Sequence, residues 1–156
     1  MSKKVLIIGG AGYIGGYLTD FLKEKNYEVS VFDKLIYETR YLKDVNFIYG
    51  DIRDTKAVLK AANEHDVVVL AAALVGDPAC AVDVELTDSI NHQAIKNICE
   101  QLDESKHVIF LSTCSVYGAQ SDVLDEDSPT NPLSAYASTK LLAEKYVSKR
   151  NGTIFR

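Results

Sequence analysis

The sequence has 156 residues, 47% of them hydrophobic and 25% charged, which is the size and balance of one globular domain with an apolar core. Its formal net charge of -5 disfavours nucleic acid or an anionic membrane as the main partner, and no apolar run approaches the ~20 residues of a membrane-spanning helix. No cleavable signal follows Met1, so we expect a cytoplasmic protein. Three widely spaced cysteines without a Cys-x-x-Cys pair, and histidines without metal-ligand spacing, argue against a disulfide framework and a metal site.

Short runs rich in β-branched residues alternate with longer amphipathic stretches along the whole chain. The predicted strands are residues 4–8, 28–32, 46–49, 67–72, 108–112 and 153–155, and the predicted helices are residues 14–25, 55–63, 88–102 and 135–150. In the first helix, Ile14, Leu18, Phe21 and Leu22 share one stripe. This alternation predicts an α/β fold with a doubly wound parallel sheet.

A glycine-rich segment joins the first predicted strand to the first predicted helix. Gly10-x-Gly12-x-x-Gly15 overlaps a second register, Gly9-x-x-Gly12-x-x-Gly15. Between a strand and a helix, such glycines permit a tight turn, close approach of a pyrophosphate to backbone N–H groups, and close packing of the helix. Asp33 ends the next predicted strand eighteen residues after Gly15, where a carboxylate can accept hydrogen bonds from ribose hydroxyls. The sequence therefore predicts a dinucleotide site.

Charged residues near this site bear on the choice of dinucleotide. Asp33 would repel a 2′-phosphate, which favours NAD over NADP, whereas Lys34 beside it weakens that preference. Asp51 and Ile52 follow the third predicted strand, where they could cover the adenine. A solvent-exposed turn is an equally good interpretation of these two residues.

A candidate reactive group lies in the second half of the chain. Tyr136 and Lys140 are four residues apart on a predicted helix and are therefore neighbours on one face. An ammonium beside a phenol favours the phenolate, so we expect Lys140 to lower the Tyr136 pKa, as a general base requires. Thr113 follows the fifth predicted strand, at the edge where such sheets bind ligands, and could hydrogen-bond the same substrate hydroxyl.

Together these motifs resemble the extended short-chain dehydrogenase/reductase family, specifically its nucleotide-sugar epimerase and dehydratase branch. The matching segments are Gly-Gly-Ala-Gly-Tyr-Ile-Gly from Gly9, residues 71–73, Asn91, residues 112–113 with 116–118, and Tyr136 with Lys140. The resemblance covers essentially the whole chain. It implies a Rossmann fold, an NAD cofactor, a nucleotide-diphosphate sugar as substrate, and hydride transfer between sugar C4 and the nicotinamide.

The resemblance also implies roles for individual residues. Thr113, Tyr136 and Lys140 would be catalytic. NAD would be held by Gly9, Gly12, Tyr13, Ile14, Gly15, Asp33, Lys34, Asp51, Ile52, Ala71, Ala72, Ala73, Tyr136 and Lys140. In this family the predicted helices 88–102 and 135–150 form a dimer seam, so a homodimer is expected.

Residues 74–80 look like a subgroup of this family that oxidises GDP-manno-heptose to its 4-keto form in capsule polysaccharide biosynthesis. We expect that reaction, with a nucleotide-sugar 4-epimerase as the alternative and a non-catalytic NAD-sensing module as the second alternative. Cys114 and Ser115 stand where 4,6-dehydratases carry an acidic pair, which disfavours dehydration. Asp77 could contact the substrate, although an Asp-Pro pair is also typical of a turn.

Members of this family are longer than the present chain. The sequence ends at Arg156, within the predicted sixth strand. We therefore expect residues 1–156 to be the N-terminal NAD-binding Rossmann domain of a longer protein, without the C-terminal substrate domain.

Overall fold

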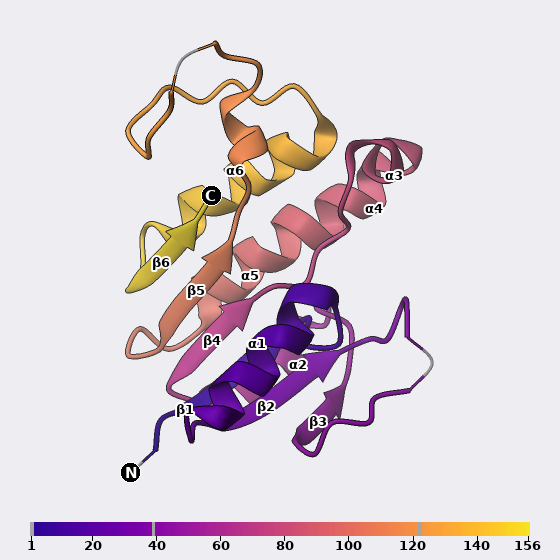
Figure 1. Ribbon diagram of the computed structural model, residues 1–156, viewed down its shortest axis with the longest axis vertical. Coiled ribbons are helices and arrows are strands. Elements are labelled where there is room, and N and C mark those ends of the chain that lie inside the picture. The colour runs from indigo at the N-terminus through magenta and orange to yellow at the C-terminus, as the bar shows by residue number, and fades with distance from the viewer. Residues whose placement is uncertain (1, 39, 122) are drawn as a thin grey trace.

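A six-stranded sheet forms the centre of the computed structural model, which describes residues 2–38, 40–121 and 123–156 (Figure 1). The strands in chain order are β1 (Lys4–Ile8), β2 (Glu28–Asp33), β3 (Asn46–Tyr49), β4 (Val67–Leu70), β5 (His107–Leu111) and β6 (Gly152–Phe155). They are ordered β3-β2-β1-β4-β5-β6, and every neighbouring pair is parallel. The predicted doubly wound α/β fold is therefore confirmed, and the strand order reverses between β1 and β4.

Helical segments follow most of the strands. They are α1 (Tyr13–Glu24), α2 (Thr55–Asn63), α3 (Asp77–Val82), α4 (Val84–Asp88), the π-helical turn η1 (Ser89–Gln93), α5 (Ala94–Gln101), the 3-10 turn η2 (Cys114–Tyr117) and α6 (Ala135–Val147). Among the described helices, none combines the length and apolar character needed to cross a bilayer.

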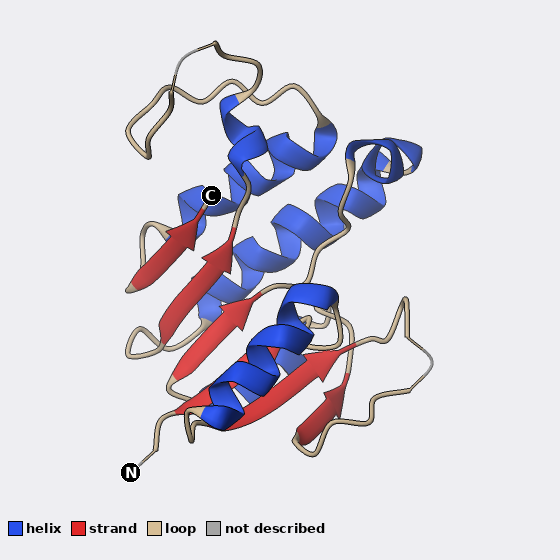
Figure 2. Ribbon diagram, in the orientation of Figure 1, coloured by secondary structure: helices blue, strands red, loops and turns tan. Residues whose placement is uncertain are grey.

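Helices lie on both faces of the sheet (Figure 2), and an apolar cluster lies on each face. On one face, α2, α5 and α6 pack over the larger cluster, in which Phe32, Ile95 and Phe110 are almost fully buried. On the other face, α1 lies over β1 and β2, and its Leu18 and Leu22 pack against the smaller cluster. Figure 2 shows no described helix in front of β5 and β6 on the α1 side.

The predicted stripe on the first helix is only half correct. Leu18 and Leu22 pack on the sheet, but Ile14 is 60% exposed and Phe21 is 44% exposed. The residues of α1 that are fully buried are small, Gly15 and Thr19, because the helix lies very close to the glycine-rich segment. Close packing of the α1 backbone against the glycine-rich segment therefore takes the place of part of the apolar stripe that was predicted for this helix.

Three element boundaries differ from prediction by two residues or more. The fourth strand ends at Leu70 rather than residue 72, because the amides of Ala71 and Ala72 both donate to the carbonyl of Ile8 (2.9 and 2.8 Å), which turns the chain. The last long helix ends at Val147 rather than residue 150. The helix predicted at 88–102 begins earlier, at Val84, because the Asp83 carboxylate accepts a hydrogen bond from the Leu86 amide (2.8 Å) and caps it.

Two features, one before that helix and one within it, were not predicted. The Asp-Pro pair at 77–78 opens the short helix α3 rather than a turn, since proline is also well tolerated in a first helical turn. The turn η1 turns Asn91 toward the loop after β4, where its amide nitrogen donates to the Leu74 carbonyl and its oxygen accepts from the Leu74 amide (both 2.9 Å). Asn91 thereby fixes the path of residues 71–74.

Candidate active site

The glycine-rich segment between β1 and α1 is shaped by contacts that leave no room for side chains. Gly9 has a φ of 89°, and a Cβ on it would collide with the backbone of Ala72. A Cβ on Gly15 would collide with the carbonyl oxygen of Gly9. Gly12 differs, because its backbone conformation suits any residue and a Cβ there would meet only the Gly9 carbonyl at 3.3 Å. The fold thus requires Gly9 and Gly15, whereas Gly12 lies open at the N-terminus of α1.

A cavity of about 900 Å³ opens beside this segment, at the carboxyl ends of the strands around the β1–β4 reversal. Twelve of the residues predicted to hold NAD line it: Gly9, Gly12, Tyr13, Ile14, Gly15, Asp33, Lys34, Asp51, Ile52, Ala71, Ala72 and Ala73. Open α/β sheets bind ligands at this position, where a helix N-terminus presents free N–H groups to phosphate. The exposed Gly12 at the α1 N-terminus therefore fits a pyrophosphate.

Asp33 is fixed by two backbone amides at the edge of this cavity. Its carboxylate accepts hydrogen bonds from the Ala11 amide (3.0 Å) and the Leu35 amide (2.7 Å). The hydrogen bond from Ala11 connects the end of β2 to the glycine-rich segment. It therefore fixes the position of the Asp33 carboxylate relative to the turn between β1 and α1. Asp33 remains partly exposed and lines the cavity, as a ribose-binding carboxylate must.

Asp51 faces the same cavity and is paired with two cations. Its carboxylate accepts from Lys34 Nζ (2.8 Å) and from Arg53 Nε and Nη2 (3.0 and 2.6 Å). The Arg53 hydrogen bonds hold the pKa of Asp51 well below its usual range. Sequence reasoning missed Arg53, although its position two residues after Asp51, in the turn that follows β3, could have indicated it. Leu35, Tyr37, Glu38, Val75 and Leu86 also line the cavity without having been predicted.

The three predicted catalytic residues lie on the two segments that follow β5, the strand next to β4: Thr113 comes directly after the strand, and Tyr136 and Lys140 are on α6. Ser134 caps α6 by accepting from the Ala137 amide (3.1 Å), which places Tyr136 and Lys140 in its first turns. Thr113 follows β5, and its hydrogen bond to the Tyr136 hydroxyl favours the phenolate. None of the three lines the 900 Å³ cavity, which on this side reaches the loop at residues 71–75.

The expected lowering of the Tyr136 pKa is wrong for the chain by itself. Burial raises the pKa of Tyr136, and the Thr113 hydrogen bond offsets only part of that effect. Lys140 does not assist, because its ammonium lies over the Phe110 ring, 4.0 Å from the centroid. Lys140 is itself only 3% exposed, and burial lowers its pKa to about 8, with Glu144 acting in the opposite direction.

One turn after Lys140, Glu144 anchors a buried polar network that sequence reasoning missed. The Ser112 hydroxyl donates to its carboxylate, and Arg156 donates through Nε (3.1 Å) and Nη2 (2.7 Å). Arg156 also donates to the Tyr117 hydroxyl (3.2 Å). The network joins α6 to the ends of β5 and β6, so it fixes the segment that carries Thr113 relative to the helix that carries Tyr136.

Comparisons with known proteins agree with this arrangement. Residues 5–153 match the family model described as the NAD dependent epimerase/dehydratase family. A UDP-glucose 4-epimerase of Halalkalibacterium halodurans is 34% identical over 149 residues, which cover 90% of this chain and 44% of that protein. A UDP-N-acetyl-alpha-D-glucosaminuronate decarboxylase of Bacillus cytotoxicus is 33% identical over 134 residues, with coverages of 81% and 41%.

Solved structures give the same result. The UDP-glucose 4-epimerase of Brucella ovis, crystallised with NAD, superposes with a TM-score of 0.87 at 27% identity, covering 95% of this chain and 47% of that one. The present chain spans less than half the length of each of these three proteins.

The contrast between Gly12 and Gly15 gives a matched pair of variants. Gly12→Ala should leave the thermal unfolding midpoint almost unchanged, because an N-cap alanine is tolerated at a cost of about 1 kcal/mol or less. It should nevertheless weaken NAD binding by about tenfold or more, since its methyl group enters the phosphate position. Gly15→Ala should instead lower the unfolding midpoint clearly. Calorimetry with NAD and thermal denaturation measure the two effects, and equal loss of stability in both variants would contradict this assignment.

The buried charge of Lys140 predicts a pH-dependent stability. Because its pKa is about 8 in the folded chain and 10.5 for an unperturbed lysine, the unfolded chain binds more protons between these values, and stability rises with pH there. Lys140→Met removes the buried charge. The variant should be more stable than the wild type at about pH 7, and its advantage should shrink as the pH rises from about 8 to 10.5. Urea denaturation across this range tests this, and a constant difference would disprove it.

Proposed function

We propose that this chain, which belongs to the NAD dependent epimerase/dehydratase family, is the NAD-binding domain of an enzyme acting at C4 of a nucleotide-diphosphate sugar. Residues 1–156 would form that domain, and a 4-epimerase is the reaction that we favour. Members of this family are NAD-dependent enzymes, and the Brucella ovis relative was crystallised with NAD. Because the chain spans less than half of such relatives, the activity proposed is that of the whole protein.

One observation carries the proposal. Thr113 and Tyr136 contact each other after β5, and the buried Lys140 lies one helical turn after Tyr136. The neighbouring strand, β4, ends at a cavity whose glycine-rich edge suits a pyrophosphate. A module that only senses NAD has no chemical need for a proton acceptor beside the cofactor site. The convergence of Thr113, Tyr136 and Lys140 therefore favours an enzyme over a non-catalytic sensor.

The residues suggest a division of chemical tasks. NAD, when bound, supplies a hydride acceptor. Tyr136 would accept the proton of the sugar C4 hydroxyl, and Thr113 would hydrogen-bond to the Tyr136 hydroxyl and to the same sugar oxygen. Lys140 would bind the nicotinamide ribose, which offers its buried ammonium hydrogen-bond acceptors in place of the Phe110 ring. Since burial raises the Tyr136 pKa in the chain by itself, Tyr136 needs a positive charge from the bound cofactor to act near neutral pH.

The candidate reactions differ in the sugar nucleotide that they use and in whether the hydride returns to the keto intermediate. UDP-glucose 4-epimerase is the name of relatives from several organisms, which supports a UDP-sugar and return of the hydride. Oxidation of GDP-manno-heptose, the reaction expected from residues 74–80, finds no support in these names. It remains the second candidate, because α3, which contains Asp77 and Cys80 of that segment, packs against α6, the helix that carries Tyr136.

A homodimer remains part of the proposal. The helices expected to form its seam, α5 and α6, pack side by side on one face of the sheet. On α6, Leu142 is 37% exposed, so an apolar residue is available to a second copy. The seam would lie on the face of the molecule opposite α1.

Substitution of Tyr136 tests the proposed chemistry. Tyr136→Phe in the whole protein keeps the ring but removes the proton acceptor, so interconversion of UDP-glucose and UDP-galactose should fall by about 10²–10⁴-fold. NAD affinity should stay within about threefold, because the Tyr136 ring is kept and the contacts proposed for the glycine-rich segment, Asp33 and Lys140 are unchanged.

Chromatography of the sugar nucleotides and absorbance of NADH measure the outcome. An epimerase forms the second sugar without accumulating NADH, whereas a dehydrogenase accumulates NADH in step with keto sugar. Wild-type turnover by the Tyr136→Phe variant would exclude Tyr136 as the base. Tight NAD binding without turnover of UDP- or GDP-sugars would favour the sensing module.

A further inference from the structure

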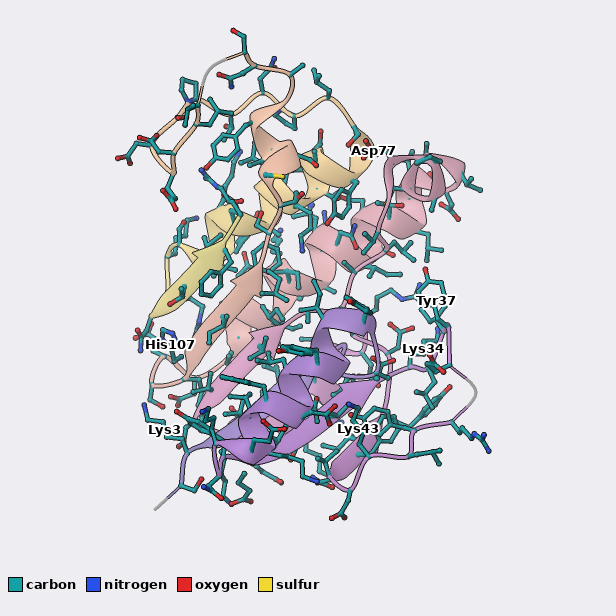
Figure 3. All side chains as sticks on the ribbon, viewed as in Figure 1. Lys3, Lys34, Tyr37, Lys43, Asp77 and His107 are labelled. Carbon is teal, nitrogen blue, oxygen red and sulfur yellow. The ribbon has the colours of Figure 1, made fainter. Side chains whose placement is uncertain are left out.

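A cluster of three charged residues, Lys34, Asp51 and Arg53, lies at the edge of the cavity next to Asp33. All four residues line the cavity. Figure 3 shows Lys34 on the segment that follows β2, at the same end of the sheet as the labelled Tyr37. The side chains of Lys34 and Arg53 are 43% and 39% exposed, and that of Asp51 is 24% exposed. Two cations therefore share this edge of the cavity with Asp33, the carboxylate proposed to bind the ribose.

Such cations have the chemistry that binds a phosphate. Lysine and arginine make charge-assisted hydrogen bonds to phosphate oxygens, and an arginine near the ribose is how related folds accommodate the 2′-phosphate of NADP. Judged by its cations alone, this edge would suit NADP. Its suitability depends on whether Lys34 and Arg53 are free to turn toward the ligand.

The hydrogen bonds indicate that they are not free. Asp51 accepts from Lys34 at 2.8 Å and from Arg53 through two nitrogens at 3.0 and 2.6 Å. The Arg53 amide also donates to Asp51 (2.9 Å), which fixes the carboxylate against its own backbone. Asp33, by contrast, is held by the amides of Ala11 and Leu35, so the two carboxylates have separate partners.

We propose that Asp51 is a second determinant of cofactor selectivity, which keeps Lys34 and Arg53 in ion pairs and so withholds them from the 2′-phosphate of NADP. Asp33 repels that phosphate directly, and Asp51 removes the cations that could compensate. The inference rests on the proposed function, namely that the dinucleotide occupies this cavity with its ribose at Asp33. It assigns the choice of NAD to two carboxylates that act by different means.

Because the two carboxylates act by different means, substitutions of Asp33 and Asp51 should have non-additive effects on the preference for NAD over NADP. Asp33→Ser alone should improve NADP binding little, because Lys34 and Arg53 stay paired with Asp51. Asp51→Asn alone should also improve it little, because Asp33 still repels the phosphate. The Asp33→Ser/Asp51→Asn variant should change the ratio of the NAD and NADP dissociation constants by about tenfold more than the product of the single changes. Any contact of Asp51 with adenine is common to both cofactors and cancels in this ratio.

Calorimetric titration of the chain with NAD and with NADP measures these ratios, and thermal unfolding verifies that each variant is folded. Adding Lys34→Met and Arg53→Met to the double variant should abolish the extra gain. Should Asp51→Asn fail to fold, Asp51→Ser keeps an acceptor for the Arg53 amide and replaces it.

Three results would decide against the inference. A double variant whose ratio equals the product of the single variants would overturn it, as would a gain that persists without Lys34 and Arg53. If the folded wild type binds neither NAD nor NADP, the proposed function fails together with the inference. NAD binding with additive substitutions refutes the inference alone.

Discussion

The close approach of the glycine-rich segment to the start of the loop after β4 is the constraint on which this structure depends. Gly9 lies against the Ala72 backbone, and Gly15 lies against the Gly9 carbonyl. These contacts set α1 tightly on β1 and bring the β1 and β4 ends together where the strand order reverses. The cavity is a consequence, because the chain leaves the sheet in opposite directions from these two neighbouring strands. The Asp33 bond to Ala11 then fixes one side of it, and Asn91 fixes the other through Leu74.

The strand and helix order was predictable from sequence because hydrophobic runs and glycine positions are local signals. All six predicted strands are present, and twelve of the residues predicted to hold NAD, Asp33 among them, line one cavity. What the sequence could not supply depends on tertiary contacts. Pro78 is compatible with a turn and with a helix, and only packing selects the helix α3. Likewise, helical spacing makes Lys140 a neighbour of Tyr136, but the position of Phe110 decides where its ammonium lies.

Two charged side chains of α6 are buried near the carboxyl end of β5. Lys140 and Glu144 are both almost fully buried, one turn apart on α6. Glu144 is compensated by Arg156 and Ser112, whereas Lys140 has an aromatic face in place of a hydrogen-bonding carboxylate. An under-compensated ammonium costs stability but stays available to a ligand's oxygen atoms. In the proposed enzyme, Lys140 would therefore bind the cofactor, whereas Glu144 holds the end of β5 beside α6.

The proposed chemistry requires that NAD occupies the cavity at the β1–β4 reversal, with its phosphates at the N-terminus of α1. An NAD titration followed by the backbone amide resonances of the ¹⁵N-labelled chain tests this requirement directly. We expect saturable shifts that are largest in residues 9–15, at Asp33 and in residues 71–74. Shifts confined to other parts of the chain, or a folded chain whose spectrum does not respond to NAD, would contradict it.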